Sequence, residues 1–176
     1  MSSKAAGTAY DFFKNVDNLM TETQDLINTL KALYNNLSFG PSILLNSGTA
    51  KSAYTTTSTT QVMSGLGITF TPASTGRVLI IGIVQVSNNT AADGVTANLK
   101  YGTGSAPAAG AAVTGTTLGE TVSVVSETAN QSVIGSIIGV VTGLTVGTTY
   151  WLDVAVKAVT GGTASATLLG YVAIEF

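Results

Sequence analysis

Residues 148–159 have the sequence TTYWLDVAVKAV, and this stretch decides the fold class. Its apolar side chains recur at every second residue, the period of a β-strand with one buried face. The side chains expected in the core are Tyr150, Leu152, Val154 and Val156. The alternate set, expected on a solvated face, is Trp151, Asp153, Ala155 and Lys157. The pattern predicts a strand that lies between a core and water.

The same period extends outward from this stretch in both directions. In VTANLKY, residues 95–101, the expected core face holds Val95, Ala97, Leu99 and Tyr101. In TASATLLGYVAIEF, residues 163–176, one face is expected to hold Leu168, Val172, Ile174 and Phe176. Segments rich in Gly, Ser, Thr and Asn separate these stretches. The sequence therefore predicts a mainly β chain, an antiparallel β-sandwich or jelly roll of about seven to nine strands over residues 41–176.

Two further stretches are apolar on both faces: RVLIIGIVQV, residues 77–86, and SVIGSIIGVV, residues 132–141. Strands of this kind are covered on both sides. In a single two-layer sandwich, however, one face of each strand meets water. We therefore expect another subunit to cover the second face of these two strands.

The N-terminal residues follow a different period. In FFKNVDNLMTETQDLINTLKALYNNL, residues 12–37, apolar residues recur three and four apart over almost four heptads, which predicts one long α-helix of coiled-coil or bundle type. Gly40 and Pro41 are suitable residues for ending this helix. The sequence thus divides into residues 1–40, a helix for oligomerisation and anchoring, and residues 41–176, the β domain.

The apolar face of this predicted helix is three columns wide. Its residues are Phe12, Phe13, Val16, Leu19, Met20, Thr23, Leu26, Ile27, Leu30, Leu33, Tyr34 and Leu37. A two-stranded coil needs only two columns, so the helix either packs against its own domain or joins copies of the chain in a bundle. Thr23 is the polar residue on this otherwise apolar face, and we expect the packing between helices to be weakest there.

Composition excludes several classes of function. Charged residues make up 9% of the chain, the net charge is −2, and there is no Cys or His. With no basic patch to neutralise phosphates, a nucleic-acid partner is not expected. The missing Cys and His remove disulfides, thiol chemistry, the usual general base and the commonest transition-metal ligand.

No catalytic site, metal site or cofactor is predicted. The acids of the β domain are scattered along the sequence: Asp93, Glu120, Glu127, Asp153 and Glu175. The Gly-rich residues 102–110 lack the ending of a phosphate-binding loop, and residues 87–94 hold few calcium ligands. We therefore expect the protein not to be an enzyme.

No signal for secretion or membrane insertion is found. The first ten residues lack the apolar run of a signal peptide, and the longest apolar run, residues 78–84, is too short to span a bilayer. We expect a product made in the cytoplasm; if the protein works outside a cell, release inside a virus particle would carry it there.

Two features are candidate receptor contacts. Trp151 is the only tryptophan and is expected on an outward face, where it could stack on a sugar or lie in a subunit contact. The loop SNNTAADG adds Asn88, Asn89 and Asp93.

Three stretches resemble the C-terminal modules of phage and prophage virion fibre proteins. They are residues 64–95, residues 101–119 and residues 143–176, and the key pieces are TPASTGRVLI, GLTVGTTYW and the closing VAIEF. By analogy of fold, the β region is also similar to the trimeric jelly rolls of the C1q and TNF type.

This resemblance implies a trimeric structural protein of a virion. Its N-terminal part would dock to other virion proteins, its jelly roll would point outward, and it could attach to a host-surface glycan or protein. Because the N-terminal segment is short, a short spike, head fibre, decoration protein or tail-tip module is expected rather than a long fibre. The alternative is a lectin-like carbohydrate-binding module.

Overall fold

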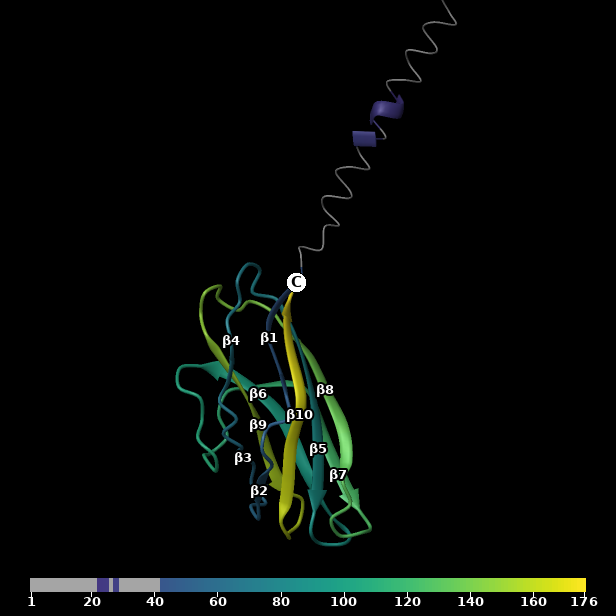
Figure 1. Ribbon diagram of the computed structural model, residues 1–176, viewed down its shortest axis with the longest axis vertical. Coiled ribbons are helices and arrows are strands. Elements are labelled where there is room, and N and C mark those ends of the chain that lie inside the picture. Colours follow the sequence, from purple (N-terminus) through teal and green to yellow (C-terminus); the bar gives the residue numbers. More distant parts are fainter. Residues whose placement is uncertain (1–21, 26, 29–41) are drawn as a thin grey trace, which may run out of the picture. The chain divides into compact units, whose positions relative to one another are not determined.

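The computed structural model describes residues 22–25, 27–28 and 42–176. The β domain is built from strands of very unequal length (Figure 1). In chain order they are β1 Ile43–Thr49, β2 Tyr54–Thr56, β3 Val62–Met63, β4 Ile68–Phe70, β5 Val78–Asn88, β6 Asp93–Thr103, β7 Thr116–Ser126, β8 Val133–Val141, β9 Tyr150–Ala158 and β10 Ala164–Glu175.

Two antiparallel sheets form the domain. Sheet A has the order β1-β10-β5-β8, with β2 also paired to β10. Sheet B has the order β3-β9-β6-β7, with β4 also paired to β9. The chain crosses between the sheets after β2, β4, β5, β7, β8 and β9, which is the winding of a double-sheet jelly roll. The predicted mainly β, antiparallel architecture is confirmed, and the short strands β2, β3 and β4 are additional to it.

The core lies between the two sheets. Sheet A contributes Ile80, Val84 and Leu168, and sheet B contributes Leu99 and Leu152; all five are at most 1% exposed. Gly82 lets the sheets approach closely, because a Cβ at this position would lie 2.7 Å from the Cδ1 atom of Leu99. The predicted core faces of residues 95–101 and 150–156 are confirmed, since every predicted core residue of these stretches is in the core except Tyr101, which packs against it.

The predicted N-terminal helix falls mostly outside the described residues. Residues 22–25 and 27–28 are helical, and they lie inside the predicted range of 12–37. Of the twelve predicted seam residues, only Thr23 and Ile27 are described, and Ile27 is 40% exposed. A long helix and its packing stay predictions.

One expectation for β10 is wrong. Leu168, Val172, Ile174 and Phe176 were expected on a single face, but a β-bulge between Leu168 and Gly170 shifts the register. Because one extra residue reverses the side on which later side chains point, Leu168 lies in the core while Val172 and Ile174 lie on the outer side of sheet A. The inward positions after the bulge include Ala173 and Glu175.

The expectation of a solvated second face on β9 is also wrong. Trp151, Asp153 and Ala155 are at most 3% exposed, and only Lys157 of that set is partly exposed. Met63 and Ala111 cover Trp151 and Ala155 in a small second cluster. The loop after β6 is held against β3 by the hydrogen bonds Gly110 N–H to Met63 O (2.8 Å) and Met63 N–H to Ala111 O (2.9 Å). Residues of this loop, distant in sequence, thus replace water on that face.

Candidate functional site

The outer side of sheet A carries a continuous apolar surface, here called the aliphatic face. Its members point away from the core and come from four adjacent strands. They are Leu44, Leu79, Ile81, Ile83, Ile134, Ile138, Val140, Val172 and Ile174.

Strand register explains why these side chains meet. Val140 pairs with Leu79, Leu79 with Ile174, and Ile174 with Leu44, so one row of aliphatic side chains crosses the whole sheet. The next row joins Ile138, Ile81 and Val172. Directly opposed residues on one face of antiparallel strands lie within contact distance. The rows therefore form one patch rather than scattered residues.

The aliphatic face is open to solvent in the single chain. Ile134 is 62% exposed, Ile138 54% and Val140 55%. The only charged residue in β1, β2, β5, β8 and β10 is Glu175, which is 0% exposed and points inward. Large apolar patches without charge are typical of interaction surfaces. The sequence predicted that both faces of residues 77–86 and 132–141 would be covered. In the structure, nothing within residues 42–176 covers their outer face.

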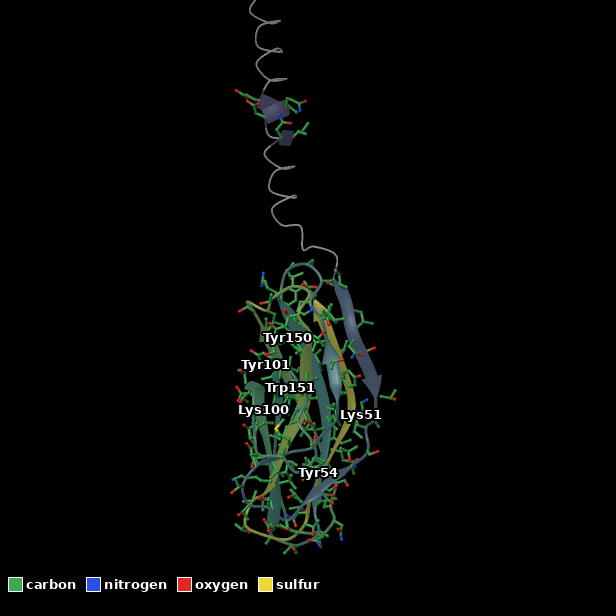
Figure 2. All side chains as sticks on the ribbon, turned by 90° about the vertical axis from the view of Figure 1, so that its left-hand side faces the viewer. Lys51, Tyr54, Lys100, Tyr101, Tyr150 and Trp151 are labelled. Atoms are coloured by element: carbon green, nitrogen blue, oxygen red, sulfur yellow. The ribbon has the colours of Figure 1, made fainter. Side chains whose placement is uncertain are left out.

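Trp151 is not available as a receptor contact. It is 3% exposed beneath the loop after β6, and its indole Nε1–H donates to the carbonyl oxygen of Thr103 at 3.1 Å. Trp151 belongs to β9, and Figure 2 shows it between the labelled residues Tyr101 and Lys100. Its role is to anchor the loop.

The three candidate residues of the loop between β5 and β6 also have structural roles. Asn88 is 2% exposed, and its Nδ2 donates to the carbonyl oxygens of Gly94 (2.9 Å) and Gly161 (3.1 Å). Asp93 is 4% exposed and accepts from the N–H of Thr160 at 3.0 Å. This hydrogen bond is the main reason that the pKa of Asp93 lies below its usual value; burial opposes it.

Asn89 is exposed, but its Oδ1 accepts from the N–H of Thr163 at 2.7 Å. The structure therefore brings Asn88, Asn89 and Asp93 together at the loop between β9 and β10, but it does not bring them to Trp151.

Two buried acids hold loops in place. Asp153 accepts from the hydroxyl of Ser64 (2.6 Å) and from the N–H groups of Gly65 (3.0 Å), Leu66 (3.2 Å) and Val154 (2.7 Å). With these partners the carboxylate fixes residues 64–66 over sheet B. An ionised carboxylate in the interior needs such donors.

Glu175, on β10 of sheet A, fixes residues 73–76 in the same way. Its carboxylate accepts from the N–H groups of Ala73 (2.6 Å), Ser74 (3.0 Å), Thr75 (2.5 Å) and Gly76 (2.8 Å). Burial raises the pKa of Glu175, but these four hydrogen bonds outweigh it and lower the pKa to about 2.

A polar groove lies on the outer side of sheet B, with a volume of about 830 Å³. Its polar lining residues include Gln61, Thr96, Asn98, Thr121 and Lys157. Its apolar lining residues include Val62, Ala112 and Val113. Sequence reasoning missed this groove, because the loop that walls it meets β3 through contacts between residues about fifty apart. The one available signal was Asn98, a carboxamide on the outward face of a strand.

No cluster of three acids within the described ranges could hold a metal ion. No helix among the same residues is long and apolar enough to cross a membrane.

No family model matches the chain, and no curated protein sequence matches it. Three solved structures that it resembles belong to infectious bursal disease virus. The structure of the Gx strain aligns with a TM-score of 0.40 and 18% identity over 76% of this chain and 31% of that chain. The structure of the Gt strain aligns at 0.37 and 17% over 74% and 32%. The crystal structure of the VP2 subviral particle aligns at 0.36 and 19% over 77% and 38%. This chain thus spans about a third of each of those chains, and scores at this level assign no function.

Proposed function

We propose that the protein is a structural subunit of a virion that assembles with copies of itself through the aliphatic face. The observation that carries the proposal is the exposure of this face to solvent. On β8, the side chains of Ile134, Ile138 and Val140 are each more than half exposed. Together with the resemblance of residues 64–95, 101–119 and 143–176 to virion fibre modules, it favours a trimer that forms a short spike, fibre or decoration protein.

A second copy of the chain is the best-fitting occupant of the aliphatic face. A charged partner would find no counter-charge on this face, whose strands carry only the inward-pointing Glu175. An identical apolar face brings neither repulsion nor unpaired charge, and homo-oligomers with closed symmetry are the commonest assemblies. Subunit interfaces of this kind are more apolar than the rest of the surface.

The predicted helix of residues 12–37 would supply the second contact between copies and the connection to the particle. Residue 42 lies beside the C-terminus, since Ile43 pairs with Glu175 (Figure 1). Residue 42 is thus at one end of the sandwich, and the loops after β5 and β9 lie at the opposite end, which we propose points outward. The role proposed is structural rather than enzymatic, and residues 1–40 are proposed to contact other virion proteins.

Two single variants, Ile138→Lys and its control Val125→Lys, test this proposal. Both residues are exposed aliphatic strand residues, at 54% and 61%, but Val125 lies on β7 of sheet B. We expect sedimentation velocity to show that Ile138→Lys dissociates the oligomer and Val125→Lys does not. An oligomer unaffected by Ile138→Lys would overturn the aliphatic face as the contact.

The virion role has its own test. An antibody raised against residues 42–176 should label intact purified particles in electron micrographs at a fixed position. Particles that contain none of the chain would overturn the proposed role while leaving self-assembly standing.

A further inference from the structure

We propose that the polar groove on sheet B binds an acidic saccharide, a sugar ring that carries a carboxylate or sulfate group. This goes beyond the proposed structural function, and it assigns a ligand to residues other than those suggested by the sequence. The groove and the aliphatic face lie on opposite outer sides of the sandwich. Assembly through sheet A therefore leaves the groove open.

The floor of the groove is a fixed network of carboxamide and hydroxyl groups. Asn98 is only 6% exposed; its Oδ1 accepts from Nε2 of Gln61, and its Nδ2 donates to Oγ1 of Thr121 at 2.5 Å. These contacts set the orientation of both amides. The carbonyl oxygen of Gln61, the hydroxyl hydrogen of Thr121 and the second N–H of each amide are left for a ligand. Such a mixture of donors and acceptors pairs well with sugar hydroxyl groups.

One wall of the groove is apolar. Val62 and Ala112 form a β-bridge that joins the loop after β6 to β3, and the neighbouring Val113 is 37% exposed. A sugar ring has C–H groups on its faces and hydroxyl groups around its rim. It can therefore lie against this wall while its hydroxyl groups reach the amides of the floor. The volume of the groove, about 830 Å³, lies within the usual size of small-ligand sites, roughly 300–1,000 Å³.

The charge of the groove selects an acidic ligand. Lys157 lines it beside Thr96, its partner across the strands, and no acid is among the lining residues. Within residues 42–176, the Lys157 amine has no carboxylate partner. Glu120 adjoins Thr121 in sequence but does not line the groove. An ammonium group pairs strongly with a carboxylate or sulfate.

Other ligand classes fit less well. A nucleic acid needs several cations along its backbone, and this groove supplies one lysine. An extended peptide would pair with a sheet edge, whereas the floor residues Thr96 and Asn98 belong to β6, which is hydrogen-bonded on both sides.

The test is a titration of the ¹⁵N-labelled full chain with three acidic probes: 3′-sialyllactose, trigalacturonate and a heparin-derived tetrasaccharide. Lactose is the neutral control. We expect at least one acidic probe to shift the side-chain amide resonances of Asn98 and Gln61. The Lys157→Gln variant should then bind that probe at least about tenfold more weakly, since a charge-assisted hydrogen bond is lost. The Lys100→Gln variant should bind as the wild type does, because Lys100 lies on the same side of β6 but outside the lining.

Three results would overturn the proposal. They are no shift of these resonances with any acidic probe up to about 10 mM, lactose binding as tightly as the acidic probes, and unchanged binding by Lys157→Gln. Each leaves the oligomeric state untouched, so failure of the groove proposal and failure of the assembly proposal are separate outcomes.

Discussion

Replacing Glu175 with glutamine tests how the C-terminal strand is held. The carboxylate is 0% exposed and accepts from four consecutive backbone N–H groups, those of Ala73, Ser74, Thr75 and Gly76, at 2.5–3.0 Å. The hydroxyl of Thr75 adds a fifth donor at 3.2 Å. Glutamine keeps the shape but replaces one accepting oxygen with an NH₂ group that faces these donors.

The size of the effect follows from the hydrogen bonds lost. The Oε2 atom accepts from Ala73 (2.6 Å) and Ser74 (3.1 Å), while Oε1 accepts the remaining contacts. An amide that turns its oxygen toward Thr75 and Gly76 leaves the Ala73 N–H without an acceptor. A hydrogen bond to a charged group contributes about 1.5–3 kcal/mol. We expect Glu175→Gln to lower the free energy of unfolding by about 3 kcal/mol, or the melting temperature by about 10 °C.

The same contacts predict a pH dependence. The pKa of Glu175 is about 2 in the folded protein, against the ordinary value of 4.5 for a glutamate in water. Because the folded pKa is lowered, the carboxylate stabilises the fold fully above pH 4.5, and this contribution is lost as the pH falls toward 2. The difference between wild type and Glu175→Gln should therefore be constant above about pH 5 and shrink below it.

Urea unfolding of both proteins between pH 2 and 7, followed by tryptophan fluorescence, measures this difference. The matched control is Glu127→Gln, since Glu127 is an exposed acid whose neutralisation should change little. A Glu175→Gln variant as stable as the wild type at pH 7, or a difference that does not shrink in acid, would refute the role of these hydrogen bonds.

Three further substitutions probe contacts within the sandwich. Asp153→Asn should cost about 2–3 kcal/mol of stability and speed amide exchange at residues 65 and 66, which lose a charged acceptor; hydrogen exchange measures both, and unchanged rates would contradict the role. Gly82→Ala should destabilise by about 1–3 kcal/mol in thermal unfolding, since its Cβ would lie 2.7 Å from a buried Leu99 methyl, and a neutral result would mean that the sheets can separate freely. Trp151→Phe should cost about 1 kcal/mol or more in urea unfolding, and wild-type Trp151 emission should be blue-shifted and shielded from iodide; quenching in the native state would contradict its burial.

Local periodicity was enough to predict the inner faces of the regular strands β6 and β9. Leu152 and Val156 on β9, and Val95 and Leu99 on β6, lie in the core as expected, because a period of two fixes alternate sides wherever a strand is regular. The same logic failed in β10, where the bulge after Leu168 reverses the later residues. A bulge adds one residue without a clear compositional mark, so Val172 and Ile174 could not be placed from sequence.

The candidate site was less accessible to sequence reasoning, because it depends on contacts between distant segments. Trp151 was expected outside because the sequence does not show that the loop after β6 returns over it. Glu175 meets residues about one hundred positions earlier, and Asn98 meets Gln61 across another strand. Composition predicted only one part of the site, the contact surface on residues 77–86 and 132–141. Both stretches are apolar on both faces, so neither has a polar face to expose to water.

The molar mass of the full chain in dilute solution, measured by light scattering, tests the central claim most directly. A trimer joined through the aliphatic face predicts three times 17.7 kDa, about 53 kDa, held over a tenfold dilution. A mass of 17.7 kDa at every concentration would contradict the account, because the aliphatic side chains of β5, β8 and β10 would then remain in water.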